Sequence, residues 1–208
     1  MCTIILSGKI VHVGGVTFPA SMLLFPGTFL IADALTEVYG YAVTRKVVWA
    51  GLLSEVIWIL GFWIAAALPP APFWDGQSAF VAALGLTPRI AVAGMTAYVM
   101  GEFVNSYVLA KMKVWSSGRQ LPLRMIVSTI LGAGVDTLVV ITIAFSGVFA
   151  VSDMIAMGLS VWAIKIAWEL IALPISIPFI AWLKREERQD HFDRQTDFNP
   201  FKINGGGA

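Results

Sequence analysis

The amino-acid sequence predicts an all-α integral membrane protein, built as a bundle of six transmembrane helices with both termini in the cytoplasm. Of its 208 residues, 58% are hydrophobic and 13% are charged, which is about half the charged share of an ordinary globular domain. The mean hydropathy of +0.79 indicates the same class. The helix count and the orientation follow from two further observations, the number of apolar runs and the positions of Lys and Arg.

Six apolar runs approach or exceed the roughly 20 residues that a membrane-spanning helix needs. In chain order they cover residues 1–13, 19–38, 47–68, 88–111, 121–146 and 153–183. The first run is short, so we expect either a tilted helix packed inside the bundle or a true start further upstream. Together the runs predict one transmembrane domain over residues 1–183 and a polar, partly disordered cytoplasmic tail over residues 184–208.

The orientation follows from the basic residues, because the cytoplasmic loops of membrane proteins are enriched in Lys and Arg. Eleven of the 14 Lys and Arg residues fall between runs two and three, around the loop between runs four and five, or in the tail. They are Arg45, Lys46, Lys111, Lys113, Arg119, Arg124, Lys184, Arg185, Arg188, Arg194 and Lys202. All eleven lie on one side of the membrane if both termini are cytoplasmic.

Several functional classes are disfavoured by composition. A net charge of +1 makes nucleic acid an unexpected partner. The single Cys2 excludes a disulfide framework, and His12 and His191 are too far apart in sequence to form a ligand pair, so no metal or cofactor is expected. No catalytic motif is present, and the protein is not expected to be an enzyme. An intramembrane pair of Asp33 and Asp136 is the weak enzymatic alternative.

Ionisable side chains inside membrane spans cost several kcal/mol and tend to mark function. Asp33 and Glu37 lie one helical turn apart near the cytoplasmic end of the second run, and Glu55 lies near that end of the third. The functional interpretation competes here with simple pairing to Arg45 or Lys46. Asp33 is the deeper carboxylate and the better candidate for a site.

A second group of polar residues lies well inside runs four to six. Glu102 and Asn105 are three residues apart and share one helix face, while Lys165 and Glu169 are four apart and share another. Asp136 is surrounded by small residues, which let helices approach closely and leave room for a ligand. Carboxylates outnumber cations in this group, a pattern that favours binding of a neutral or cationic polar solute.

Four stretches of the chain together resemble a known family. They are "LFPGTFLIADALTEVYGY" followed by "TRKVVW", then "TPRIAVAGMTAYVMGEFVNSYVLAKMK", then "LPLRMIVSTILGAGVDTLVVITIAFSG", and the tail "DFNPF". The joint pattern D-x-x-x-E-x-Y-G, E-F-x-N and S-T-x-x-G-x-x-x-D is similar to the YhhQ family of queuosine precursor transporters, within the vitamin uptake transporter group. The resemblance covers about Lys9 to Phe201, and the chain has fewer residues before its first run than family members usually have.

The resemblance implies a multi-pass protein of the bacterial inner membrane that imports 7-deazaguanine precursors of the tRNA nucleoside queuosine. The expected substrate is 7-cyano-7-deazaguanine, 7-aminomethyl-7-deazaguanine or queuine. The lipid bilayer is its surrounding partner, and a homodimer is possible. The alternative function is the substrate-binding subunit of an energy-coupling-factor type importer for vitamins or nucleobases, which works only with partner ATPase components.

The substrate's chemistry suggests roles for the interior residues. The N1–H and 2-amino groups of a 7-deazaguanine are adjacent donors that suit one carboxylate, and we expect Glu102 or Asp136 to bind them, with Asn105 on O6. We expect Glu169, positioned by Lys165, to meet the 7-substituent or to bind a coupling proton. The aromatic side chains Phe103, Tyr107 and Trp168 are candidates for stacking on the ring.

A gate or coupling element is expected from residues nearer the membrane surfaces. Asp33 is a candidate for contact with either the substrate or this gate. Glu37 is expected to pair with a loop cation such as Arg45, or to take part in gating or proton exit. Lys9 and Arg89 are further candidates for gating or coupling, and Arg89 has the plain alternative of extending its charge to the outer interface.

Overall fold

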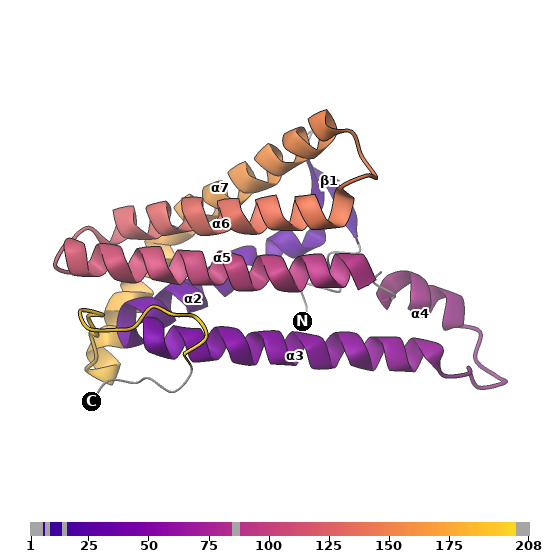
Figure 1. Cartoon of the computed structure of the whole chain (residues 1–208), viewed down its shortest axis with the longest axis horizontal. Coiled ribbons are helices and arrows are strands. Elements are labelled where there is room, and N and C mark those ends of the chain that lie inside the picture. Colours follow the sequence, from indigo (N-terminus) through magenta and orange to yellow (C-terminus); the bar gives the residue numbers. More distant parts are fainter. Residues whose placement is uncertain (1–5, 7–8, 14–15, 85–87, 203–208) are drawn as a thin grey trace.

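The structure is a computed structural model that describes residues 6, 9–13, 16–84 and 88–202. Helices dominate it, with one small sheet near the N-terminus (Figure 1). The elements in chain order are β1 (Ile10–Val13), β2 (Val16–Pro19), the 3-10 helix η1 (Ala20–Leu23), α2 (Phe25–Tyr39), α3 (Tyr41–Ala67), α4 (Gln77–Leu84), α5 (Pro88–Trp115), α6 (Leu121–Phe145) and α7 (Val151–Glu187).

Four helical stretches in the described part of the chain are long and apolar enough to cross a membrane. They are α3, α6, α7 and a fourth stretch that ends with α5. Their outer surfaces carry exposed apolar side chains such as Leu53, Leu138 and Ile175, as a surface in contact with lipid requires. The structure thus confirms a helical protein of the membrane type, but it does not confirm six spans or the side on which the termini lie.

The first predicted span is not helical where its C-terminal part is described. Residues 10–13 form β1, which pairs antiparallel with β2 so that Val11 lies opposite Phe18; residues 1–5 and 7–8 lie outside the described part. Val and Ile favour extended backbone, and a Gly-Gly pair between two such runs is a hairpin signal. These local preferences explain why a run of apolar residues adopts a strand here.

The second predicted span is divided into η1 and the short helix α2, which has Pro26 in its first turn. At its other end, Gly40 adopts φ +84° and α3 begins at the next residue. A Cβ atom at Gly40 would clash with the His191 ring and lie 3.0 Å from an Asp193 carboxylate oxygen. Only glycine accommodates this backbone conformation and this contact. Gly40 therefore forms the sharp corner between α2 and α3.

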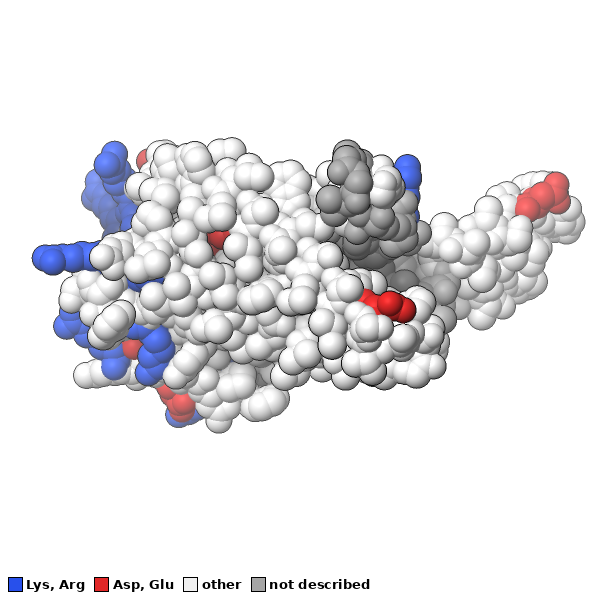
Figure 2. Space-filling view, turned by 90° about the horizontal axis from the view of Figure 1, so that it is seen from above, with Lys and Arg blue, Asp and Glu red and all other residues white. Residues whose placement is uncertain are grey.

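Basic side chains gather at one end of the molecule, which we call the basic end (Figure 2). It is formed where α2 meets α3, where α5 meets α6, and where α7 ends. An apolar cluster of four helices packs just inside it, composed of Ala34, Val38, Leu109, Met125 and Ile180. Lys and Arg residues thus cluster at one end, as the positions of the basic loops predicted. That this end faces the cytoplasm stays a prediction.

The described part of the tail, residues 188–202, is folded against the basic end. Residues 203–208 lie outside the described part, so the expectation of a partly disordered tail stays a prediction. Arg45 donates from Nη1 to the carbonyl oxygens of Asp197 (2.9 Å) and Asn199 (2.7 Å). Tyr41 donates its amide to the Asp193 carboxylate at 3.0 Å and its hydroxyl to the Phe198 carbonyl at 3.1 Å. These bonds use backbone carbonyls that no composition reveals.

Candidate functional site

Two glycines bring α5 and α6 into close contact at mid-helix. A Cβ atom at Gly132 would lie 2.6 Å from Asn105 Cβ and 2.9 Å from the Gly101 carbonyl oxygen. A Cβ atom at Gly101 would lie 2.7 Å from Asp136 Cβ. Small residues at a helix contact allow this approach, and here they hold Asn105 and Asp136 at the same contact surface.

Asp33 and Asn105 form the centre of the polar interior. Asn105 Nδ2 donates to Asp33 Oδ1 at 2.8 Å, and both side chains are almost completely buried. The other oxygen of each side chain, Asp33 Oδ2 and Asn105 Oδ1, is buried without a hydrogen-bond partner. Buried polar groups in proteins are normally paired, so two unpaired acceptors in one contact make this pair a candidate for binding a donor from outside the chain.

Two residues on α6 and α7 extend this interior. Glu169 lies close enough to Asp33 for their charges to repel, and it faces the hydroxyl of Thr129. Glu169 Oε1 and Thr129 Oγ1 are buried and lack hydrogen-bond partners as well. We call the set of Asp33, Asn105, Thr129 and Glu169 the acceptor site.

An ion pair lies beside the acceptor site. Lys165 donates to the Asp136 carboxylate and, at 3.3 Å, to the hydroxyl of Thr137. The charges of Asp136 and Lys165 reach Glu102 on α5, whose carboxylate accepts no hydrogen bond from any residue in the described ranges. The structure thus brings together the predicted site residues Asp33, Glu102, Asn105, Asp136, Lys165 and Glu169 from α2, α5, α6 and α7.

Sequence reasoning gave the hydroxyl groups of this region no binding role. Thr129 and Thr137 are nearly fully buried, and they follow Met125 and precede Ile141 on the buried face of α6. Polar residues that recur at helical spacing on the face with the small residues are the signal that would have found them. Two proposed stacking residues lie elsewhere: Phe103 packs against Tyr41 and Trp49, and Tyr107 against Phe198.

Glu37 is the centre of an ion network at the basic end. Its carboxylate receives two hydrogen bonds from Arg124, at 2.6 and 3.0 Å, and one from Lys184 at 2.7 Å. Lys113 lies 3.7 Å away and also donates to the Glu37 carbonyl oxygen. The predicted pairing of Glu37 with a loop cation is confirmed for Arg124 and Lys113, but Arg45, the cation named as the example, donates to the tail carbonyls instead. We call Glu37, Lys113, Arg124 and Lys184 the Glu37 network.

The tail completes this network through Asp190. Its carboxylate lies 2.6 Å from the Lys113 ammonium and 2.7 Å from that of Lys184. Burial raises the pKa of Asp190, but the hydrogen bonds and charges of Lys113 and Lys184 outweigh burial and hold the pKa below its usual value of 3.8. The basic end is thus closed by ion pairs. They join cations from α5, α6 and α7 to one carboxylate from α2 and one from the tail.

The remaining two candidates lie apart from the polar interior. Lys9 is exposed beside the small sheet, and its carbonyl oxygen accepts a hydrogen bond from Ala20. Arg89 donates to the carbonyl oxygens of Ile143 (2.5 Å) and Ser146 at the far end of α6. Terminal helix carbonyls lack intrahelical partners, so Arg89 caps α6 in this structure.

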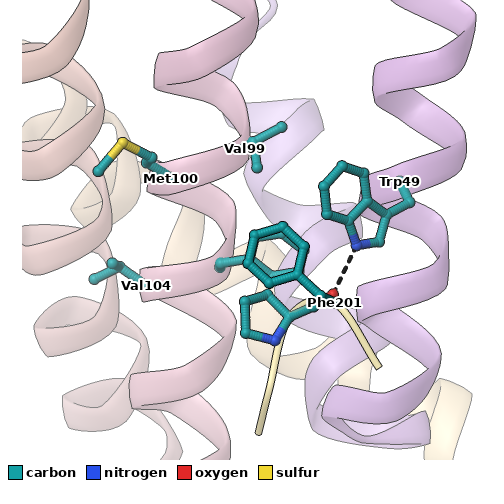
Figure 3. Close-up of a pocket in the computed structure, with 7 residues that line it drawn as sticks. Trp49, Val99, Met100, Val104 and Phe201 are labelled. Carbon is teal, nitrogen blue, oxygen red and sulfur yellow. Dashed lines mark hydrogen bonds between the residues drawn. The ribbon is translucent and has the colours of Figure 1, made fainter. Parts of the chain in front are cut away.

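Two cavities accompany these sites. The first, of about 250 Å³, lies between α3, α5 and the tail and is lined by apolar side chains, among them Trp49, Met100 and Phe201 (Figure 3). It offers a polar heterocycle almost nothing to bind. The second, of about 490 Å³, lies between α6 and α7 and includes Thr137 and Trp162. It falls within the usual size range of small-molecule sites and adjoins the Lys165 ion pair.

Comparisons of the sequence with known proteins identify the family. Residues 19–179 match the sequence family described as putative vitamin uptake transporter. The Bacillus subtilis (strain 168) protein named probable queuosine precursor transporter is 28% identical over 181 residues, which cover 86% of this chain and 79% of that protein. The Escherichia coli (strain K12) queuosine precursor transporter is 26% identical over 121 residues, which cover 58% of this chain and 52% of that protein.

No solved structure matches the chain. The family match covers most of the sequence, and together with the two relatives it confirms the resemblance to the YhhQ family. The chain belongs to the putative vitamin uptake transporter family, and it is a multi-pass transporter of the bacterial inner membrane rather than an enzyme.

Proposed function

We propose that the chain imports 7-deazaguanine precursors of queuosine and binds them at the acceptor site. The names of the two relatives support the class of substrate. One structural observation supports the place: four buried side chains from α2, α5, α6 and α7 each carry an oxygen without a hydrogen-bond partner. Leaving such groups unpaired costs about 1–3 kcal/mol each, so a ligand that pairs with them gains affinity.

The acceptor site calls for a ligand rich in hydrogen-bond donors. The free oxygens of Asp33, Asn105 and Glu169 can only accept, while Thr129 can donate or accept. A 7-deazaguanine presents N1–H and its 2-amino group side by side, which suits Asp33 or Glu169, and O6 accepts from Thr129. Hydrogen bonds to charged groups contribute about 1.5–3 kcal/mol each. This set replaces Glu102 and Asp136 as the proposed partners of the guanine-like edge, because Asp136 is already paired with Lys165.

The cavity between α6 and α7 provides a route to this site in the proposal. α7 diverges from α6 away from the basic end (Figure 1). The cavity lies between these two helices, and its lining residues include Val151 and Thr137. At the basic end the Glu37 network and the tail close the path. Substrate therefore enters through the α6–α7 cavity and leaves past Glu37 when the network opens, with residues 1–183 as the transport domain and residues 184–208 as the tail that covers the exit.

Queuosine in tRNA provides the test. The host is a bacterium that can neither make the precursors nor import them, and each precursor is supplied separately at limiting concentration. Boronate gels separate queuosine-containing tRNA from unmodified tRNA. We expect the chain to restore modification with at least one precursor, and the Asp33→Asn variant to lose most of this activity. Glu186→Gln is the matched control, because Glu186 is exposed and forms no side-chain hydrogen bond or ion pair in the described part of the chain.

Two results would contradict the proposal. No restoration by any precursor, with the chain shown to be in the membrane, would refute import by this chain alone and favour a binding subunit that needs ATPase partners. Full activity of both Asp33→Asn and Glu169→Gln would refute the acceptor site while leaving the transported compound unchanged.

A further inference from the structure

The polar interior holds more negative than positive side chains. Four carboxylates, those of Asp33, Glu102, Asp136 and Glu169, stand against the ammonium of Lys165. Lys165 is bound to Asp136 and Thr137. Asp33 Oδ2 and Glu169 Oε1 are buried without partners. Uncompensated charge is strongly disfavoured in hydrocarbon, so this interior requires a cation from outside the protein or a proton on the excess carboxylates.

Glu102 differs from the other three carboxylates in its surroundings. Asp33 is tied to Asn105, Asp136 to Lys165, and Glu169 faces Thr129. In the described part of the chain the Glu102 carboxylate accepts no hydrogen bond, and the Ser106 hydroxyl donates to the backbone carbonyl of Glu102 at 2.7 Å. The charged and titratable groups that act on it come from every neighbouring element: Asp33 of α2, Tyr98 of α5, Asp136 of α6 and Lys165 of α7, with Glu55 of α3 acting on Tyr98.

The geometry favours a proton over a divalent cation. Calcium and magnesium need several oxygen ligands, carboxylates among them, that converge on one point, and no group of three or more His, Cys, Asp or Glu side chains in the described ranges converges in this way. The carboxylates instead lie separately, each within electrostatic range of its neighbours. A single carboxylate is sufficient to carry one proton.

We propose that Glu102 binds the proton that drives import, one proton for each substrate molecule. The proton attaches to the Glu102 carboxylate from the outer side, crosses with the bound substrate, and leaves to the cytoplasm when the Glu37 network opens. The ionised carboxylate then repels Asp33 and Asp136 until the next proton arrives. This inference rests on the proposed function, because it assigns the energy source to the same interior.

The test uses the purified full-length chain in vesicles and neutral 7-cyano-7-deazaguanine as the probe. With the membrane voltage clamped to zero, an outside pH one unit below the inside should drive tenfold accumulation, since one proton per substrate transfers the whole gradient. A protonophore should abolish accumulation, and substrate should induce proton uptake. Accumulation that ignores the pH gradient, in vesicles that do exchange substrate, would overturn the inference and leave the proposed function standing.

Glu102→Gln separates a coupling role from a binding role. Gln has nearly the same shape as a protonated Glu, so we expect exchange of external labelled for internal unlabelled substrate within twofold of wild type. Accumulation driven by the pH gradient should fall at least tenfold. Loss of both activities in a variant that melts like wild type would instead make Glu102 a binding residue and overturn the inference. Glu186→Gln is the control, because it makes the same substitution at an exposed position. Absence of exchange in the wild type would refute the proposed function itself.

Discussion

Replacement of Glu37 by Gln should open the basic end, because three cations then lose the carboxylate that they share. In the structure Arg124 holds both carboxylate oxygens, at 2.6 and 3.0 Å, and Lys184 holds one at 2.7 Å. Glu37 and Arg124 are fully buried, while Lys184 is partly exposed and retains Asp190. These bonds therefore cannot be exchanged freely for bonds to water.

The expected loss of stability of the closed state follows from the burial of the Glu37 network. Removing one partner of a buried ion pair costs about 3–5 kcal/mol, and the lower figure applies here because Asp190 remains beside the cations. A loss of about 3 kcal/mol in the closed state corresponds to roughly a 150-fold shift towards the open state. Glu37→Gln should show this shift as increased access to the interior from the cytoplasmic side.

The assay is alkylation of a cysteine placed at Ser128, a fully buried position one turn from Arg124 on α6. In a Cys2→Ala background, inside-out vesicles are treated with a maleimide that does not cross membranes. The rate should rise by about two orders of magnitude in Glu37→Gln and stay unchanged in Glu186→Gln. An equal rate in wild type and Glu37→Gln, with both proteins folded, would refute the assignment of the Glu37 network as the closure.

Three further predictions concern packing, binding and pH. Gly132→Ala should destabilise the purified protein by about 1–3 kcal/mol in thermal unfolding, because its Cβ would meet Asn105 and the Gly101 carbonyl; Gly61→Ala, with nothing within 4 Å, should not. Asp33→Asn should weaken precursor binding about 10- to 100-fold in calorimetry through loss of a charged acceptor; wild-type affinity would contradict the acceptor site. Since the folded pKa of Asp190 lies below 3.8, its ion pairs should stabilise the protein above that pH and lose this effect as pH falls through the folded pKa. The melting-temperature difference between wild type and Asp190→Asn should therefore be constant from about pH 8 to 5 and shrink as pH falls below 3.8 and through the folded pKa; a difference that does not shrink on acidification would contradict this.

The sequence predicted the location of polar groups better than their partners. Helical spacing placed Glu102 with Asn105 on one face and Lys165 with Glu169 on another, and these faces do meet in the interior. Which group pairs with which depends on helix packing, and Glu37 is 87 positions from Arg124. Hydropathy and charge patterns carry no information about such distances.

The first span was misjudged for a local reason, and the folding of the described tail also has a local reason. The run at residues 10–13 is apolar enough for a helix window, but its β-branched residues and the following glycines favour the hairpin that forms with residues 16–19. The tail is polar, yet it is ordered by bonds from Tyr41, Arg45 and Trp49 to its backbone carbonyls. Amino-acid composition describes side chains only, so it does not predict hydrogen bonds to backbone carbonyls.

Uptake by the purified chain alone tests the central claim most directly. Vesicles that contain only this protein would be given radiolabelled 7-cyano-7-deazaguanine and 7-aminomethyl-7-deazaguanine in turn, with guanine as competitor and Asp33→Asn vesicles in parallel. The account predicts saturable uptake of at least one precursor that Asp33→Asn lacks. Binding without uptake, or uptake only after ATPase partner proteins are added, would contradict import by this chain on its own.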